Sequence, residues 1–323
     1  MGNCAVILAA GDGKRMKANH SKVLCEILGS PMLDWVMNTA KKTVSSVCAV
    51  IGRGGNEVKA RLSGRAETAE QSQRLGTGHA VLMAVPYLER QSASHVLILN
   101  GDAPLMDAET VSAAFEAHIQ NENDLTVISA SINDPAGYGR IVRHGGAFSA
   151  IIEERDADAS QKSIKEVNSG AYWFKRHALL RALPLMTNDN AGKELYLTQT
   201  VEIIKAAGGR CAAHTAENPD VILGANDRMQ LIDLEERARR RIIARHMENG
   251  VRIPSAFGIL IGPHVEIKPG CVIMPNVILT GRTVVGKYCT VGPYVSAHNA
   301  IIGDGAVLSN TNLRDKTVSA GEA

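Results

Sequence analysis

Long apolar runs are missing from this sequence. No uninterrupted apolar stretch approaches the ~20 residues that a helix needs to cross a bilayer. The first residues run directly into a strand-like stretch, without the charged start and cleavage site of a secretion signal. We therefore expect no membrane contact and a cytoplasmic location.

Paired cysteines are missing as well. The chain has six cysteines, but none forms a Cys-x-x-Cys pair and no histidine cluster lies near them. This arrangement argues against a disulfide framework or a zinc site and fits a reducing compartment.

An excess of basic charge is also absent. Lys and Arg number 35 against 33 Asp and Glu, for a net charge of +2. Nucleic-acid-binding domains usually carry a strong basic excess, so we expect no nucleic-acid partner. A hydrophobic content of 45% is typical of a globular protein, and 323 residues favour two domains over one core.

The first part of the chain contains alternating strand-like and helix-like segments. This alternation predicts an α/β fold, a Rossmann-like domain with a mixed, mostly parallel sheet and helices on both faces. Ligands of such sheets bind at the carboxyl ends of the strands, where the loops 10–16 and 100–105 lie. The expected strands are 4–10, 45–52, 94–102 and 125–132, and the expected helices are 32–42, 77–88 and 108–120.

The pattern changes near residue 228. Residues 228–250 have the spacing of a charged amphipathic helix closed by Gly250, which we interpret as a connecting helix. After it, aliphatic residues recur every six positions, which predicts a hexapeptide parallel β-helix of roughly three coils. We therefore divide the chain into 1–227, 228–250 and 251–323. The repeat positions are Ile261, Ile267, Ile273, Leu279, Val285 and Val291.

The stretch LAAGDGKRM, which begins at Leu8, joins an apolar strand to glycines and two cations. It is not a Walker A loop, because Leu8 stands where glycine is needed, nor a dinucleotide fingerprint, because Met16 replaces the third glycine. Backbone N–H groups of such a turn can still face an anion, beside Lys14, Arg15 and the later Lys22. Taken alone, a glycine turn with surface basic residues explains the stretch equally well.

The loop LNGDAPL places Asp102 after a fully apolar strand. A carboxylate at this edge suits a hard cation such as Mg²⁺, which takes few protein ligands and leaves the others to phosphates and water. The alternative is an aspartate that caps the next turn.

The motif QSQRLGTGHA begins at Gln71. The amide of Gln71 can pair with the edge of a base, and the glycines allow close approach of the backbone. We interpret His79 as a packed helical residue without a catalytic role.

Seven motifs in one order carry a family resemblance. They are LAAGDGKRM, SKVL, LGTGHA, NGDAPL, DPAGYGRIV, IIEERDA and EVNSGAYWF. In this order the chain resembles the bacterial N-acetylglucosamine-1-phosphate uridylyltransferases over about residues 5–230. The family's C-terminal half is a left-handed β-helix acetyltransferase, and the hexads match its beginning. The resemblance implies an Mg²⁺-dependent enzyme that joins UTP and N-acetylglucosamine-1-phosphate into UDP-N-acetylglucosamine and pyrophosphate, and a homotrimer held by the β-helix.

The resemblance also implies roles for the residues that match its motifs. Arg15 and Lys22 would be the catalytic cations on the triphosphate and the sugar phosphate, and Asp102 and Asn226 would hold Mg²⁺. The nucleotide would contact Leu8, Ala9, Ala10, Gly11, Gln71, Gly76, Thr77 and Gly101. The amino sugar would contact Gly139, Glu153 and Asn168. For Glu153 an exposed charge and for Asn226 a helix N-cap remain alternatives.

The implied mechanism needs no protein nucleophile. The sugar phosphate attacks the α-phosphorus of UTP in line, and pyrophosphate leaves. The protein has to hold two anions together and neutralise the developing charge.

Five positions depart from the family pattern. Lys14 stands where Thr is usual, and Ser21 where Pro precedes the active-site lysine. Arg74, Asn100 and Gln199 stand where Gln, Tyr and Asp are common. Because two of these positions lie in nucleotide motifs, a different base or sugar-1-phosphate stays open as the substrate.

The β-helix is short for an acetyltransferase. About 70 residues of repeat remain, without the coils in which the family builds its acetyl-CoA site. We therefore expect no acetyltransferase activity, and we interpret His298 as a coil residue. A non-catalytic nucleotide-binding assembly protein is a further alternative, against which the joint presence of Arg15, Lys22, Asp102 and Asn226 argues.

Overall fold

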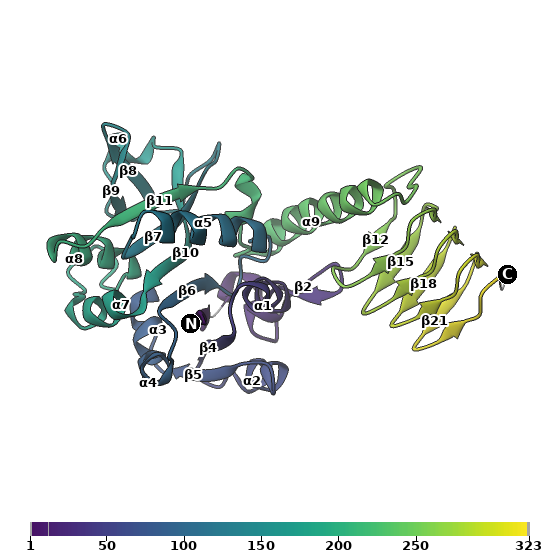
Figure 1. The fold of residues 1–323 in the computed structure, drawn as a ribbon, viewed down its shortest axis with the longest axis horizontal. Coiled ribbons are helices and arrows are strands. Elements are labelled where there is room, and N and C mark those ends of the chain that lie inside the picture. Colours follow the sequence, from purple (N-terminus) through teal and green to yellow (C-terminus); the bar gives the residue numbers. More distant parts are fainter. Residues whose placement is uncertain (1, 12, 322–323) are drawn as a thin grey trace. The chain divides into compact units, whose positions relative to one another are not determined.

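The computed structural model describes residues 2–11 and 13–321, and only the backbone of Lys14, so the role of the Lys14 side chain lies outside the described residues. The chain divides into two compact units (Figure 1). Unit 1 comprises Met1–Leu24 and Met32–Asp227, and unit 2 comprises Cys25–Pro31 and Arg228–Ala323. Within the described residues, none of the helices combines the length and apolar character that crossing a membrane requires.

A nine-stranded sheet forms the centre of unit 1, with the main strand order β11-β7-β10-β6-β1-β4-β5. β1 (Cys4–Ala9) pairs in parallel with β4 (Ser46–Gly52) and with β6 (His95–Asn100). β10 (Glu166–Lys175) runs antiparallel to β6 and to β7 (Leu125–Ser131). The expected mixed, mostly parallel sheet is thus confirmed. The other strands are β5 (Glu67–Gln71), β8 (Arg140–His144), β9 (Ala147–Ile152) and β11 (Cys211–Thr215).

Strand β1 is apolar along its length because helices cover both faces of the sheet. Val6 belongs to a core with helices α3 (Thr77–Met83), α4 (Val85–Arg90), α7 (Arg176–Ala182) and α8 (Thr200–Ala206). Ile7, the next residue, belongs to a second core with helices α1 (Met32–Thr43), α2 (Asn56–Leu62) and α5 (Ala108–Gln120). The sheet is therefore a rigid layer whose strand ends are free to carry a site.

The single helix expected at 77–88 is wrong, because the structure has two helices there. Helix α3 ends at Met83, Ala84 separates the helices, and α4 begins at Val85. Pro86 lies in the first turn of α4, where its missing N–H leaves no hydrogen bond unmade. The proline therefore begins a new helix instead of continuing the first.

The larger segment of unit 2 begins with the long helix α9 (Arg228–Glu248). The short strands β2 (Glu26–Ile27) and β3 (Ser30–Pro31) belong to the same unit, and the N–H of Leu28 between them donates to the carboxylate of Glu235 at 3.0 Å. Gly250 follows the helix at φ +83°, and its N–H donates to the carbonyl of Met247. Glycine takes this left-handed conformation most easily, so it closes the helix here.

Three parallel sheets form the rest of unit 2. Ile261 lies beside Leu279, and Leu279 beside Ala297, so one turn of the coil contains three strands. The expected hexapeptide β-helix is confirmed. The first sheet stacks β12 (Leu260–Ile261), β15 (Val277–Thr280), β18 (Val295–His298) and β21 (Asn312–Arg314). The second stacks β13 (Glu266–Ile267), β16 (Val284–Val285), β19 (Ile301–Ile302) and β22 (Thr317–Val318), and the third stacks β14 (Val272–Ile273), β17 (Thr290–Val291) and β20 (Val307–Leu308).

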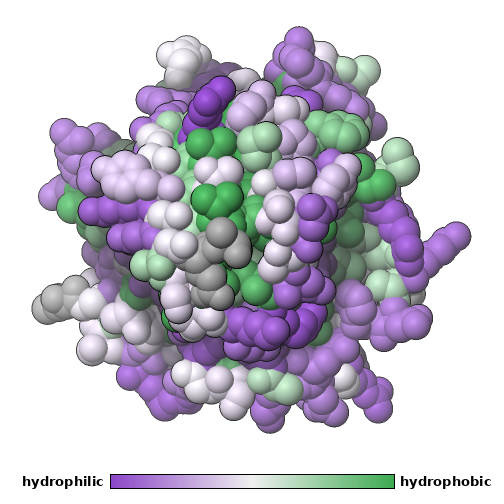
Figure 2. All heavy atoms as spheres, turned by 90° about the vertical axis from the view of Figure 1, so that its right-hand side faces the viewer, coloured by the Kyte–Doolittle hydropathy of each residue, from purple (hydrophilic) through white to green (hydrophobic). Residues whose placement is uncertain are grey.

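The inward residues of the last described coil are slightly less buried than those of the coil before it. In the last coil, Leu313 and Val318 are 7% and 8% exposed, whereas Ala297 and Ile302, one coil earlier, are 0% and 1% exposed. Figure 2 looks toward this end and shows apolar side chains at its centre with hydrophilic side chains around them.

Candidate functional site

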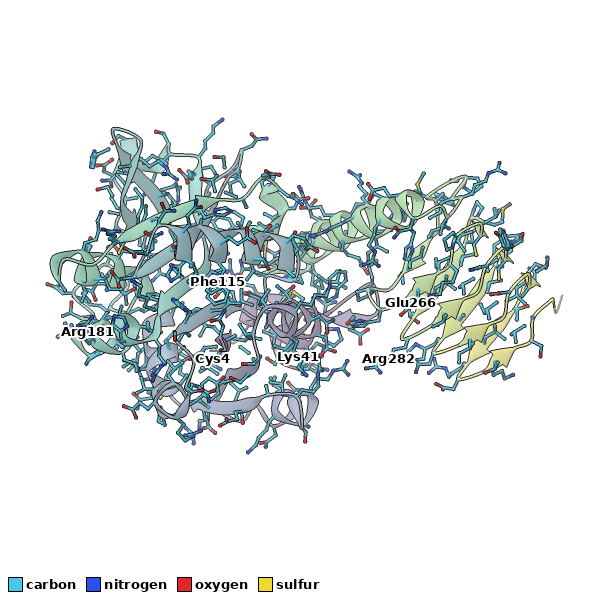
Figure 3. All side chains as sticks on the ribbon, in the orientation of Figure 1. Cys4, Lys41, Phe115, Arg181, Glu266 and Arg282 are labelled. Carbon is cyan, nitrogen blue, oxygen red and sulfur yellow. The ribbon has the colours of Figure 1, made fainter. Side chains whose placement is uncertain are left out.

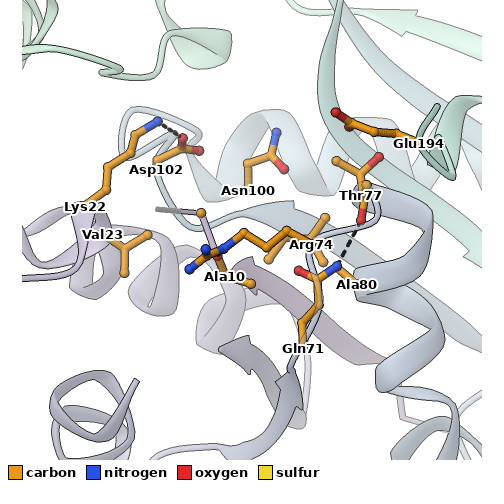
Figure 4. A pocket seen from close by; sticks show the side chains of 13 residues that line it. Ala10, Lys22, Val23, Gln71, Arg74, Thr77, Ala80, Asn100, Asp102 and Glu194 are labelled. Atoms are coloured by element: carbon orange, nitrogen blue, oxygen red, sulfur yellow. Dashed lines mark hydrogen bonds and ion pairs between the residues drawn. The ribbon is translucent and has the colours of Figure 1, made fainter. Parts of the chain in front are cut away.

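A cavity of about 360 Å³ lies at the carboxyl ends of β1, β5 and β6 (Figure 4). Parallel pairing puts Leu8 beside Asn100, so the two loops expected to bind ligands lie next to each other. The cavity is lined by Leu8, Ala10, Gly11, Lys22, Val23, Gln71, Arg74, Gly76, Thr77, Ala80, Asn100, Asp102 and Glu194.

Close backbone approach holds the two loops together. The N–H of Gly101 donates to the carbonyl of Leu8 at 2.9 Å, and a Cβ on Gly101 would lie 3.0 Å from that carbonyl oxygen. The side chain of Ala9 points into the core on the other side of the strand. Of the residues expected at the nucleotide, Ala9 and Gly101 therefore position the loops without lining the cavity.

A buried cation lies between two oxygens at one end of the cavity. The Lys22 ammonium donates to the Asp102 carboxylate at 2.5 Å and to the amide oxygen of Asn226 at 2.7 Å. Lys22 is only 7% exposed. The pKa of Tyr138 is raised, first by burial and second by the negative charge of Asp102.

The same two oxygens suit a divalent cation. Carboxylate and amide oxygens are ligands for Mg²⁺, which needs few of them because phosphates and water complete its shell. The ammonium already shows that a positive charge is accommodated between them. A hypothetical Cβ on Gly224 would lie 2.9 Å from the carbonyl oxygen of Asp102, so a glycine allows the Asn226 segment to approach. The residues present therefore fit the metal that the sequence suggested.

The glycine loop packs against Lys22. Gly13 has φ +58°, and a Cβ there would lie 2.5 Å from the Cβ of Lys22. Arg15 follows in a short 3-10 turn, Lys14–Met16, and is exposed. Arg15 is not among the described residues that line the cavity, and its contact with phosphate stays a prediction.

The opposite end of the cavity carries an ordered amide. Gln71 is 4% exposed, and its Nε2 donates to the carbonyl of Gly76 at 3.1 Å and lies 3.0 Å from Nδ1 of His79. Thr77 accepts a hydrogen bond from the N–H of Leu197. These contacts fix Gln71 and the start of α3, and they give His79 a positioning role in agreement with its interpretation as packed.

Arg74, expected only as a departure from the family pattern, lines the cavity. Arg74 lies across the cavity in Figure 4, and its Nε donates to the carbonyl of Ala10 at 2.9 Å. Glu194 also lines the cavity and was missed. It lies 92 residues after Asp102, the nearest other lining residue in the sequence, so no local motif could have indicated it.

The three expected sugar-binding residues come together beside β10. The carbonyl of Gly139 accepts from the N–H of Asn168 at 2.8 Å, and a Cβ on Gly139 would lie 3.4 Å from the Glu153 carboxylate. Thr198 donates to Glu153 at 2.8 Å. Burial, followed by the nearby charges of Asp156 and Glu194, raises the pKa of Glu153. None of the three lines the 360 Å³ cavity of the described residues.

The chemistry of this cavity is binding and charge neutralisation. Its described lining contains two cations, two carboxylates and two amides, but no serine, cysteine or histidine. Outside this lining, burial raises the pKa of Cys4 to about 11 and that of Cys48 to about 12, so both thiols are poor nucleophiles. The arrangement thus favours transfer between two bound anions over covalent catalysis.

Comparison with known proteins agrees with this geometry. Residues 5–199 match the MobA-like NTP transferase domain. The bifunctional protein GlmU of Caldanaerobacter subterraneus subsp. tengcongensis is 43% identical over 303 residues, which are 93% of this chain and 66% of the relative. GlmU of Geobacillus thermodenitrificans is 40% identical over 316 residues, which are 97% of this chain and 69% of the relative.

A third relative, GlmU of Thermoanaerobacter pseudethanolicus, is 42% identical over 94% of this chain and 66% of its own length. The chain therefore spans about two thirds of the length of these relatives. The matches extend through both units, and the resemblance seen in the motifs is confirmed. The chain carries a nucleotidyltransferase domain of the MobA-like type and belongs to the GlmU family.

Proposed function

We propose that this chain is an Mg²⁺-dependent uridylyltransferase that joins UTP and N-acetylglucosamine-1-phosphate into UDP-N-acetylglucosamine and pyrophosphate. The observation that carries the proposal is the meeting of Asp102, Asn226 and Lys22 at the strand ends of a nucleotidyltransferase domain. The family relationship supports the substrates, since the motifs resemble those of the uridylyltransferases.

In this proposal the chain acts by holding the reactants and their charges. The N–H groups of the glycine loop and the cations Lys22 and Arg74 neutralise phosphate oxygens of UTP, with Arg15 available from the exposed turn. The phosphate of the sugar attacks the α-phosphorus in line, and the bond to pyrophosphate breaks. Mg²⁺ held by Asp102 and Asn226 would supply further neutralisation of the phosphate charge.

The fixed amide of Gln71 is placed to recognise the base. Its Nε2 is used by Gly76 and His79, so the carbonyl oxygen remains to accept from a base N–H, as uracil offers. Gly76 and Thr77 bring backbone close to the base. The cluster of Gly139, Glu153 and Asn168 would hold the amino sugar through its hydroxyls and amide.

Replacing the acid tests the metal assignment. We expect Asp102→Ala to reduce pyrophosphate release by at least about a thousandfold, because a charge that stabilises the transition state is lost. The fold should be preserved, since Asp102 lies at a cavity edge with its side chain 31% exposed. Pyrophosphate is measured by a coupled assay, and Mg²⁺ binding by calorimetry without substrate.

The matched control is Asp189→Ala, which removes an exposed aspartate of the same unit. It should leave both readouts unchanged. Near-normal turnover in the Asp102 variant would remove the basis of the metal assignment.

We also propose that the chain of 323 residues does not transfer acetyl groups and that it forms a trimer. The described β-helix has only three or four strands in each sheet, and Ile278, Ile301 and Val307 on its outer faces are exposed apolar residues that a second copy could cover. Acetyl transfer from acetyl-CoA to glucosamine-1-phosphate, and a monomer in sedimentation equilibrium, are the results that would contradict these two statements.

A further inference from the structure

Unit 2 contains a second cavity, of about 720 Å³, that the nucleotidyltransferase reaction does not use. It lies between the last turns of α9 and the outer side of β13 and β16. Its size falls in the usual range of small-molecule sites. All of its lining residues belong to unit 2, so it is a feature of that unit alone.

Cations from three separate segments converge on this cavity. Arg245 comes from α9, Lys268 from the turn after β13, and Arg282 from the turn before β16. Figure 3 labels Arg282 and Glu266 on the β-helix. Glu266, the acid in the lining, pairs with Lys268 at 3.3 Å. The side chains of these three cations are exposed, and among the described residues no carboxylate forms an ion pair with Arg245 or Arg282.

The side chain of Arg245 is exposed and lies near a second cation of the same helix. Partial burial, and then the neighbouring charge of Arg241, lower the pKa of Arg245. The C-terminal end of a helix favours cations, which accounts for part of the basic character of α9 but not for Lys268 and Arg282. An anion in the cavity would offset the repulsion among these cations.

A buried polar atom also lacks a partner here. His246 lines the cavity, is 4% exposed, and its Nε2 has no hydrogen-bond partner among the described residues. Burial, then the charge of Arg245, lower the pKa of His246 to about 4, so the ring is neutral at pH 7. A buried ring nitrogen without a partner is costly unless a ligand or water meets it.

We propose that this cavity binds a multiply charged phosphate, the chemistry that pyrophosphate and nucleoside di- and triphosphates share. Arg245 and Arg282 bind phosphate oxygens through charge-assisted hydrogen bonds, and His246 completes the site. The site is separate from the catalytic cavity, so it stands whether or not the proposed reaction is correct.

Selective labelling tests this proposal on the full chain. Histidine is labelled with ¹³C, and the ring signal of His246, assigned with His246→Gln, is followed while pyrophosphate is added at constant ionic strength. We expect a saturable shift. His79, which contacts Gln71 in unit 1, reports pyrophosphate binding at the catalytic cavity separately.

Two variants locate the site. Arg282→Gln removes one charge-assisted hydrogen bond. It should raise the Kd for pyrophosphate, measured from the His246 signal, about tenfold or more. Arg314→Gln removes the same charge from an exposed position of β21 outside the cavity and should leave it unchanged. Amide exchange shows whether each variant keeps the β-helix.

Other anions test the chemical class. Pyrophosphate and UTP should bind more tightly than orthophosphate. The proposal is overturned if the His246 signal does not saturate, if sodium chloride reproduces its shift, if orthophosphate binds equally well, or if the Arg282 and Arg314 variants behave alike.

Discussion

The sequence predicted the residues at one end of the cavity, which are Lys22, Asp102 and Asn226. Each lies in a short motif, so the sequence could name all three, although 80 and 204 residues separate Lys22 from its partners. It could not show that the ammonium contacts both oxygens at once, because that depends on loop packing. Nor could it show that Arg15 is exposed outside the cavity while Arg74 lies across it.

Arg74 should contribute to nucleotide binding more than to the chemical step. Its guanidinium holds the carbonyl of Ala10 and adds a positive charge to the cavity. We expect Arg74→Gln to raise the KM for UTP about tenfold, with a kcat changed less than about threefold, because uniform binding is lost. Steady-state kinetics with varied UTP measure both constants. A lower kcat at unchanged KM would show that Arg74 acts in the transition state instead.

Asp34 stabilises unit 1 in a pH-dependent way. Burial alone would raise the pKa of Asp34, but hydrogen bonds from Arg61 and Arg65 outweigh it and hold this pKa below its ordinary value of 3.8. The stabilisation is therefore complete above pH about 4 and is lost as the pH falls through the lowered pKa. We expect Asp34→Asn to reduce the free energy of unfolding at pH 7 by about 1–3 kcal/mol.

Urea unfolding at pH 7 and below pH 4 measures this effect. The difference between the wild type and Asp34→Asn should shrink at the lower pH. Asp233→Asn, which removes an exposed pair with Arg237, is the control and should cost less than about 1 kcal/mol. A constant difference at all pH values would contradict the account of Asp34.

Elements with a clear period were predictable, and short ones were not. Strands β1 and β6 could be predicted because burial on both faces restricts them to apolar residues. The hexads could be predicted because every sixth residue points inward and has to be aliphatic. Strands β2 and β3 have two residues each, too few for any period, so their place in unit 2 could not be foreseen. The break at Ala84 was missed because the apolar spacing continues through it.

The junction between β5 and α3 depends on a glycine. Gly76 has φ +107°, and a Cβ there would lie 2.5 Å from the carbonyl oxygen of Leu195. We expect Gly76→Ala to lower the free energy of unfolding by about 2–4 kcal/mol and to weaken UTP binding, because strain and a backbone clash add. Gly64→Ala is the control, since Gly64 has φ +70° with open space around it. Gly64→Ala should lower the free energy of unfolding by about 1 kcal/mol. Equal losses of unfolding free energy in both variants would show that the close approach of Gly76 to Leu195 is unimportant. Chemical denaturation measures both.

At the scale of the whole molecule, the two units have separate cores. The core of unit 1 is layered around a sheet, and that of unit 2 is a column of inward aliphatic residues. Loss of packing in one unit should therefore be felt mainly there, as additivity between distant sites implies. The change of period near residue 228 predicted a boundary there between the first two of three segments, but no pattern indicated that Cys25–Pro31 belongs with the second unit.

A cavity in the column tests this independence. Val291 is 0% exposed between Ile273 and Leu308. We expect Val291→Ala to destabilise unit 2 by about 1–3 kcal/mol through lost burial and an unfilled void. Hydrogen exchange should rise in β14, β17 and β20, while β1 and β6 keep the exchange of the wild type. Equally raised exchange in β1 and β6 would show that the units unfold together.

The most direct test of the central claim is a substrate panel. The purified chain is incubated with Mg²⁺, each of UTP, dTTP, CTP and GTP, and several sugar-1-phosphates, and pyrophosphate and nucleotide sugar are quantified. We expect the highest kcat/KM for UTP with N-acetylglucosamine-1-phosphate, and equal amounts of UDP-N-acetylglucosamine and pyrophosphate. A clear preference for another base or sugar, or UTP binding without any turnover, would contradict it.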